Sequence, residues 1–311
     1  MTLQIKEHRI LKIIQTLAPY LQGKERALKL SLLAFFSKGH LLIEDLPGLG
    51  KTRLAVALAK ALGLSVGRIQ CTNDLLPSDI TGLSVFNKAT GAFEFHKGPI
   101  FNNIVLVDEI NRTTPKTQSA LLEAMAEEQV TVDGKTYKLS DPFFIIATQN
   151  PLEQFGTFAL PDNQLDRFIM RISIGYPPRD FEKDILRGGS KRDSLYNIEP
   201  VVSKEETLMM QMVIKEVKIS EKMLDYIMDI IQVTRENPFI RVGLSTRGAL
   251  ALSYIAKTSA FFNGRDYIIP EDIKETSVYA IPHRLIIKEE YKELDIKEIV
   301  QSIVQEVQIP L

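Results

Sequence analysis

Cysteine is almost absent from this sequence of 311 residues, and long apolar runs are absent as well. Cys71 is the single cysteine. It excludes an internal disulfide and a zinc site built from cysteines, and is typical of a protein kept in a reducing compartment. We expect Cys71 to be a small core residue. The longest apolar runs, such as 104–107 and 143–147, are far too short to span a bilayer.

Charge of one sign is not in excess either. With 38 lysines and arginines against 39 aspartates and glutamates, the formal net charge is -1. No overall attraction therefore draws the chain to nucleic acid or to an anionic membrane. Residues 1–8 carry charges where a signal peptide would be apolar. These absences predict a cytoplasmic protein without a membrane span. The remaining composition, 45% hydrophobic and 25% charged, is that of an ordinary globular chain.

Short apolar runs alternate with helical stretches in the first part of the chain. The runs are Leu41–Ile43, Val66–Gln70, Ile104–Val107, Phe143–Ala147 and Phe168–Ile174. Continuous apolar strands of this kind are typical of a parallel sheet with helices on both faces. The sequence therefore predicts an α/β core over residues 1–176.

After Tyr176 the β-type runs nearly vanish and helical patterns replace them. These patterns cover roughly Lys204–Lys218, Glu221–Arg235, Ser245–Phe262 and Pro270–Ala280. Residues 188–193 are rich in glycine and polar side chains and are predicted to form an exposed connection. We therefore predict a second, all-α domain with its linker over residues 177–311.

Two segments interrupt the alternation of the α/β part. Residues 81–98 place apolar side chains on either side of a polar turn at 87–91. Residues 130–139 alternate around Asp133 and Gly134, a strong hairpin-turn signal. Both segments are predicted to be inserted β-hairpins. They are either edge decorations or moving elements that touch a partner, and composition does not decide between these interpretations.

A glycine-rich loop stands between the first apolar run and the helix-forming run 53–62. Its residues are Leu46, Pro47, Gly48, Leu49, Gly50, Lys51 and Thr52. Strand, loop and helix in this order suit phosphate binding, because backbone N–H groups and the positive end of the helix cradle phosphate oxygens. Lys51 would reach the terminal phosphates, and the Thr52 hydroxyl would ligate Mg²⁺. The loop predicts binding of a nucleoside triphosphate; a chance turn rich in glycine and proline is the plainer alternative.

The loop departs from the general phosphate-loop pattern at one position, where Asp45 replaces the first glycine. A carboxylate aimed at phosphates would repel them. We therefore predict that the Asp45 side chain turns away from the loop and caps a backbone N–H.

Two carboxylates, Asp108 and Glu109, follow the apolar run 104–107. Asp108 at the C-terminal end of its strand would hold Mg²⁺, usually through water. Glu109 would polarise the water that attacks the γ-phosphate. A strand that ends in solvated charges is the common alternative. Together with the phosphate loop, however, the pair indicates a site that hydrolyses a nucleotide.

Asn150 follows a further buried-type run, 143–147. In a parallel sheet this strand would end beside the Asp108 strand, where ligands bind. The Asn150 amide would then hydrogen-bond the attacking water or the γ-phosphate. A polar turn that leads to Pro151 is an equally good interpretation of the same residues.

Longer stretches of the sequence resemble the AAA+ ATPases, and among them the MoxR family. The matching stretches are 21–25, 39–52, 108–112, 115–125, 147–151 and 160–168, with thinner matches at 244–248 and 283–284. The family also relaxes the glycine that Asp45 replaces. The resemblance implies a P-loop AAA+ core, a parallel sheet flanked by helices, followed by an all-α lid domain. The two hairpins match the helix-two insert and the pre-sensor insert of this branch.

The resemblance also implies roles for individual residues. Leu21 and Gly23 would pack against adenine, and Asn150 would be the first sensor. Arg167 resembles the arginine finger, which enters a neighbouring subunit's site, and Arg247 resembles the second-sensor arginine of the lid, which acts in cis or in trans. The implied nucleotide-binding residues are Leu21, Gly23, Pro47, Gly48, Leu49, Gly50, Lys51, Thr52 and Arg53. The implied metal-binding residues are Thr52 and Asp108, and the implied catalytic residues are Lys51, Glu109, Asn150, Arg167 and Arg247.

Each arginine also has a plainer interpretation. Arg167 would then form a surface ion pair, and Arg247 would cap or brace its helix. Arg112 would face the neighbouring subunit or form a local salt bridge with Glu109 or Glu123.

A site completed by a neighbour's arginine requires a ring, most simply a homo-hexamer. The resemblance implies an ATPase, with ATP and Mg²⁺ as cofactors, that remodels or matures a partner protein in a chaperone-like role. Partners of this family commonly contain a von Willebrand factor A domain.

The alternative is an AAA+ motor acting on nucleic acid. The hairpins offer only isolated lysines where a phosphate-tracking pore needs several basic residues, so no nucleic acid partner is expected. A nucleotide-gated scaffold is a third hypothesis, against which Glu109, Asn150 and Arg167 argue together.

Overall fold

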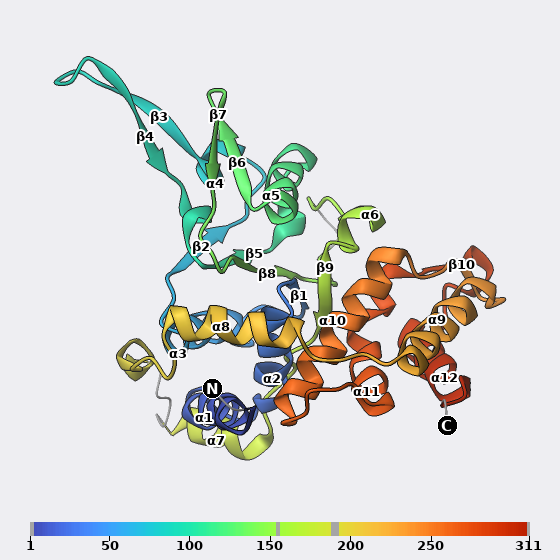
Figure 1. The fold of residues 1–311 in the computed structure, drawn as a ribbon. Coiled ribbons are helices and arrows are strands. Elements are labelled where there is room, and N and C mark those ends of the chain that lie inside the picture. Colours follow the sequence, from blue (N-terminus) through green and yellow to red (C-terminus); the bar gives the residue numbers. More distant parts are fainter. Residues whose placement is uncertain (1–2, 154–155, 188–192, 310–311) are drawn as a thin grey trace.

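A five-stranded parallel sheet forms the centre of the first part of the molecule (Figure 1). The computed structural model describes residues 3–153, 156–187 and 193–309. In sheet order the strands are β2 (Val66–Gln70), β5 (Ile104–Asp108), β8 (Phe144–Gln149), β1 (His40–Glu44) and β9 (Phe168–Ile172). Each pairing within this sheet is parallel, as the continuous apolar runs predict.

Helices cover both faces of this sheet. They are α1 (Leu3–Leu21), α2 (Glu25–Phe36), α3 (Lys51–Ala61), α4 (Pro77–Thr81), α5 (Pro115–Glu127) and α6 (Asp162–Leu165). In β5, Ile104 and Leu106 join the apolar cluster of α1, α2 and α3, whereas Val105 and Val107 join the cluster of α5. Because successive strand residues point to opposite faces, Asp108 lies on the face covered by α3, the helix that follows the glycine-rich loop.

Two β-hairpins extend from the α/β part, and their prediction is confirmed. They are β3 (Gly82–Asn87) with β4 (Ala92–Lys97), and β6 (Gln129–Val132) with β7 (Lys135–Lys138). Asp133 and Gly134 have φ angles of 50° and 72°, which suits a two-residue hairpin turn. The β3–β4 hairpin projects from the body of the molecule (Figure 1). Its Phe95 stacks on Tyr137 of the other hairpin with ring centroids 4.2 Å apart, so the two hairpins contact each other.

The C-terminal part is helical, and the predicted fold class is confirmed. Its elements are α7 (Arg179–Leu186), α8 (Lys204–Lys215), α9 (Glu221–Glu236), α10 (Thr246–Phe262), α11 (Pro270–Ala280), α12 (Ile296–Glu306) and the short strands β10 (Ile240–Val242) and β11 (Ile286–Ile287). Ser203, Ser220 and Ser245 cap α8, α9 and α10 by accepting a backbone N–H. Helix α8 ends at Lys215 and not at Lys218. The connection predicted at 188–193 lies, except for its last residue, outside the described residues.

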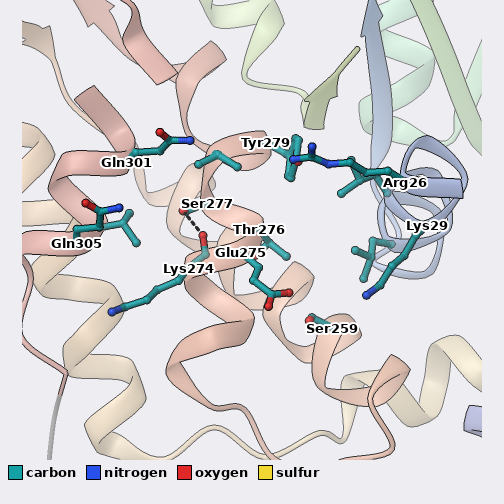
Figure 2. A pocket seen from close by; sticks show the side chains of 14 residues that line it. Arg26, Lys29, Ser259, Lys274, Glu275, Thr276, Ser277, Tyr279, Gln301 and Gln305 are labelled. Atoms are coloured by element: carbon teal, nitrogen blue, oxygen red, sulfur yellow. Dashed lines mark hydrogen bonds between the residues drawn. The ribbon is translucent and has the colours of Figure 1, made fainter. Parts of the chain in front are cut away.

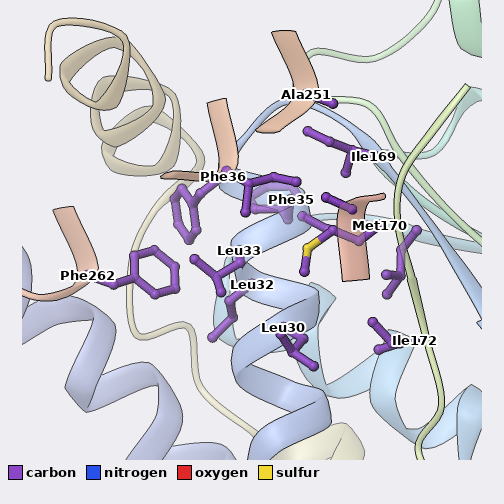
Figure 3. Packing of buried hydrophobic residues seen from close by; sticks show 14 of the residues in the cluster. Leu30, Leu32, Leu33, Phe35, Phe36, Ile169, Met170, Ile172, Ala251 and Phe262 are labelled. Carbon is purple, nitrogen blue, oxygen red and sulfur yellow. The ribbon is translucent and has the colours of Figure 1, made fainter. Parts of the chain in front are cut away.

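The helical part packs directly on the sheet part through one apolar cluster (Figure 3). Phe36 of α2 meets Phe262 of α10 edge to face, with ring centroids 5.9 Å apart. Met170 of β9 is fully buried in the same cluster. Within the described ranges, no helix has both the length and the apolar content that a membrane crossing needs.

Candidate active site

The glycine-rich loop joins the C-terminal end of β1 to the first residue of α3. Gly48 and Gly50 have φ angles of 84° and 87°, a left-handed backbone that favours glycine. A Cβ at Gly48 would meet no atom within 4 Å, so the backbone conformation and not crowding requires glycine there. The loop thus presents its backbone at the N-terminus of an eleven-residue helix, where N–H groups without helical partners attract anions.

Lys51 is held inside this loop. Its side chain donates to the backbone oxygen of Asp45 at 2.6 Å, and the residue is only 8% exposed. Burial lowers the pKa of the Lys51 ammonium, while the nearby carboxylates of Asp45, Asp108 and Glu109 oppose that shift. The ammonium is therefore positioned close to acidic groups at the mouth of the loop.

Asp45 turns away from the loop, as predicted. Its Oδ2 accepts from the backbone N–H groups of Ile174 and Gly175, the latter at 3.0 Å, and from the Ser173 hydroxyl at 3.1 Å. The Asp45 carboxylate thus holds the segment after β9 by hydrogen bonds and does not face the loop.

Replacing Asp45 with alanine is expected to destabilise the fold by about 2 kcal/mol, because it removes the acceptor of three part-buried hydrogen bonds, two of them from backbone N–H groups. Denaturant unfolding followed by circular dichroism measures this change. Asp229→Ala, at an exposed position of α9, is the control and should stay within about 0.5 kcal/mol of the unsubstituted protein. An equal effect of the two substitutions would contradict the capping role of Asp45.

A cavity of about 530 Å³ opens at the loop, and we call it the loop cavity. It is lined by Pro47, Gly48, Gly50, Lys51, Thr52, Arg53, Val56, Arg68, Gln70, Asp108, Glu109, Thr148, Leu195 and Tyr196. The loop, the ends of three neighbouring strands and a 3₁₀ turn at Asp193–Asn197 thus face one space. The cationic side chains of Lys51 and Arg53 thus face the same cavity as the carboxylates of Asp108 and Glu109.

The two carboxylates at the end of β5 are held by hydrogen bonds. Glu109 adopts a left-handed φ of 59°, and its N–H donates to the Thr148 hydroxyl at 2.9 Å. The same hydroxyl donates to Asp108 Oδ1 at 3.4 Å. The Glu109 carboxylate forms an ion pair with Arg112, whose Nε lies 3.3 Å away, and accepts from the Gln70 amide at 3.5 Å. Both acidic side chains are therefore positioned by neighbouring elements.

The donor set of the loop cavity fits a magnesium nucleotide. Thr52 contributes a hydroxyl and Asp108 a carboxylate, the oxygen ligands that Mg²⁺ prefers. A glycine loop at a helix N-terminus together with Lys51 fits phosphate groups.

The family of the chain follows from comparison with known proteins. The family model "ATPase family associated with various cellular activities (AAA)" matches residues 40–170, and the AAA lid domain model matches residues 232–307. "Chaperone MoxR1" of Mycobacterium tuberculosis is 33% identical over 290 residues, which span 90% of this chain and 76% of that protein. This chain belongs to the MoxR family of AAA+ ATPases.

Other relatives of this MoxR-family ATPase match over nearly its whole length. "Uncharacterized protein YeaC" of Bacillus subtilis is 45% identical over 302 residues, 96% of this chain and 94% of that protein. The crystal structure of a candidate ATPase from Cytophaga hutchinsonii superposes with a TM-score of 0.92 at 39% identity, covering 99% of this chain and 96% of that one. The sheet part and the helical part therefore occur together in relatives of similar length.

Six of the predicted site residues lie outside the lining of the loop cavity, namely Leu21, Gly23, Leu49, Asn150, Arg167 and Arg247. Leu21 is buried in the apolar core. Gly23 is packed against α7, where a Cβ would approach Pro178 to 2.5 Å. Asn150 comes directly after β8, and its Oδ1 accepts from the N–H of Leu152 at 3.2 Å. Leu49, in the loop itself, is also buried and not part of the lining.

Arg167 and Arg247 face a different hollow of the MoxR-family chain, which we call the arginine groove. It measures about 890 Å³ and lies between β9, α8 and α10. Asp166 organises it: the Asp166 carboxylate lies 3.6 Å from Arg247 and 2.9 Å from the buried Arg284. Burial lowers the pKa of Arg284 to about 10, so it stays charged at neutral pH. Arg167 donates to the backbone oxygen of Leu122 at 2.9 Å and forms no ion pair with the residues that the structure describes.

Two further residues bear on the alternatives left open by the sequence. Arg112 forms ion pairs with Glu109 and Glu153, so the local salt bridge with Glu109 is confirmed.

Cys71 is buried, as predicted, and burial together with the nearby carboxylates raises the pKa of its thiol to about 12. The thiol is therefore unreactive at neutral pH.

Several residues of the site escaped the sequence analysis. Arg68 and Gln70 line the loop cavity from β2, Thr148 from β8, and Tyr196 from the chain that returns after α7. Lys24, next to Gly23, donates to the backbone oxygen of Leu49 in the loop. The alternation of Arg68 and Gln70 at a strand end was the one available signal, because residues two apart share a face.

A third hollow, of about 600 Å³, lies between α2 and the helices α11 and α12 (Figure 2). The Arg26 guanidinium lies over the Tyr279 ring, 5.4 Å from its centroid, and Lys29 and Lys274 add positive charge at the edge. This cleft contains none of the predicted site residues, and we assign it no part in the nucleotide chemistry.

Proposed function

We propose that this chain hydrolyses ATP to ADP and phosphate with Mg²⁺, and that hydrolysis drives the remodelling or maturation of a client protein in a chaperone-like role. One observation supports the chemistry above all. Lys51 and Thr52 of the loop share a single cavity with Asp108 and Glu109 from the end of β5. Phosphate binding, metal binding and a base for water thus meet in one space.

Each of these residues has a proposed task. The loop N–H groups and Lys51 bind the phosphates, with Arg53 at the first turn of α3. Thr52 and Asp108 would hold Mg²⁺, which when bound neutralises charge on the phosphate oxygens. Glu109 accepts the proton of the attacking water. Asn150, released from the N–H of Leu152, would orient that water.

The adenine end of the site is proposed near the turn that follows α1. Leu21 and Gly23 stand there, and Lys24 links this turn to the backbone oxygen of Leu49. A division at residue 176, with the nucleotide-binding core at 1–176 and the lid at 177–311, fits the ranges 40–170 and 232–307 that match the two family models.

Arg167 and Arg247 are proposed to act on the nucleotide of a neighbouring subunit. Neither lines the loop cavity of its own chain, and both line the arginine groove. Asp166, which precedes Arg167 in the chain, pairs with Arg247, and the shared groove favours action in trans for both arginines. A site shared between subunits requires a closed ring, which we propose to be a homo-hexamer.

The client is proposed to be a protein with a von Willebrand factor A domain. A relative named as a chaperone supports a client-directed role. The projecting β3–β4 hairpin exposes the large apolar side chains Leu83, Val85, Phe86 and Phe93, beside a few charged ones such as Glu94 and Lys97. Apolar groups suit contact with a protein better than with a phosphate backbone, which disfavours the nucleic-acid motor.

ATP hydrolysis per subunit is expected to rise with protein concentration, by up to about 10³-fold between separated subunits and the assembled ring, because a neighbour's arginine completes each site. Phosphate release and light scattering measured together on one dilution series would check this. A dispersed monomer that hydrolyses at the full rate would refute the shared site. An assembled ring inactive with Mg²⁺ and ATP, with or without client, would refute the ATPase.

A further inference from the structure

Arg68 of the edge strand β2 holds the carboxylate at the end of the neighbouring strand. Its Nε donates to Asp108 Oδ2 at 2.9 Å, and its Nη2 lies 2.8 Å from the same oxygen. The Asp108 side chain is 12% exposed, whereas that of Arg68 is 56% exposed. The carboxylate is thus largely enclosed, while the guanidinium lies exposed at the cavity surface, where its Nη2 also donates to Gln70 Oε1 at 2.8 Å.

The remaining oxygen of this carboxylate is also engaged, because Thr148 donates to Asp108 Oδ1 at 3.4 Å. Arg68 and Thr148 therefore approach the carboxylate from two sides. The two hydrogen bonds have different consequences for a metal ion. A neutral hydroxyl tolerates a nearby cation, whereas a guanidinium repels it at close range.

We propose that Arg68 is the resident counter-ion of Asp108 in the nucleotide-free protein and that Mg²⁺ competes with it for this carboxylate. This inference rests on the proposed function, because it concerns the residue that would hold the metal. Arg68 acts through Asp108 and is therefore a positioning residue. Its exposed side chain lets it leave the carboxylate without disturbing the core.

The competition has opposite effects on metal and on nucleotide. Without Arg68 the Oδ2 atom of Asp108 loses its cationic partner, so a divalent cation should bind more tightly. The loop cavity would at the same time lose one positive charge, so nucleotide without metal should bind more weakly. A residue that only stabilised the fold would not change the two affinities in opposite directions.

The experiment measures Mn²⁺ in place of Mg²⁺ by electron paramagnetic resonance, with a non-hydrolysable ATP analogue held just below the protein concentration. Arg68→Gln is expected to tighten Mn²⁺ binding about three- to tenfold. This is the size expected when Mn²⁺ no longer has to break an exposed ion pair and no longer meets a repelling charge. Arg68→Lys should fall between it and the unsubstituted protein. Binding of the same analogue in EDTA should weaken by a similar factor in Arg68→Gln.

Arg241→Gln is the matched control, because it removes one exposed arginine from β10 in the lid (Figure 1). It should leave both affinities unchanged, and thermal unfolding would show that all variants are folded. Unchanged or weaker Mn²⁺ binding in Arg68→Gln would overturn this inference while leaving the ATPase intact. An unsubstituted protein that binds neither the analogue nor Mn²⁺ would overturn the proposed function, and this inference with it.

Discussion

Replacing Glu109 with glutamine is expected to slow ATP hydrolysis by about 10²- to 10⁴-fold while nucleotide binding is retained, because the amide cannot accept the proton of the attacking water. The substitution keeps the size of the side chain. The backbone N–H of Glu109 would still donate to Thr148, as it does at 2.9 Å. Phosphate release under single-turnover conditions, beside equilibrium binding of ATP, measures the two effects separately.

Glu153 offers the matched control for this substitution. Arg112 pairs with both Glu109 and Glu153, but only Glu109 lines the loop cavity. Glu153→Gln therefore removes the same kind of partner from the same arginine without removing the base, and hydrolysis should stay within about twofold. Equal losses in the two variants would show that Arg112, and not a base at Glu109, controls the rate.

Replacing Arg167 with alanine is expected to reduce hydrolysis by about 10³-fold without weakening nucleotide binding, because the arginine would act on charge that develops during phosphoryl transfer. Arg167 donates to Leu122 from one nitrogen only, and its buried Nε meets no acceptor among the described residues. The terminal nitrogens of the guanidinium carry N–H donors beyond the one that Leu122 accepts. Steady-state hydrolysis by the assembled protein would measure the loss.

Mixing the two inactive variants distinguishes action in trans from action in cis. A subunit with Glu109→Gln still presents Arg167, and a subunit with Arg167→Ala still has Glu109. Mixed rings should therefore recover part of the activity. Light scattering must show that both variants assemble, since failed assembly would also abolish hydrolysis. Assembled mixed rings that recover nothing would argue against a shared site.

The parallel sheet and the lid helices could be predicted because their signals are local. Buried parallel strands appear as unbroken apolar runs, and β2 was predicted with its observed bounds. Ser203, Ser220 and Ser245 mark helix starts by capping the first N–H groups. Asp133 and Gly134 marked a hairpin turn in the same way. Each signal depends on residues a few positions apart.

Strand ends were predicted less well than strand centres. The run expected to end at Ile174 ends as β9 at Ile172. Ile174 instead donates its N–H to Asp45, far away in the sequence. The sequence did predict that Asp45 caps a backbone N–H, but not which one. Asp45 was recognisable as an acceptor from its carboxylate, whereas its donor, the N–H of Ile174, depended on the path of the chain that leaves β9.

The phosphate loop, the acidic pair at the end of β5, the order of sheet and lid, and the family could all be recognised without any structure. Each of these features depends on residues that are contiguous or nearly contiguous in the sequence. Tertiary structure alone decided that Arg68 pairs with Asp108, that Lys24 binds the loop, and that Arg167 and Arg247 share a groove away from their own loop cavity. The physical reason is that these contacts join residues far apart in the chain, and their partners are chosen by which strands are adjacent and where the lid packs.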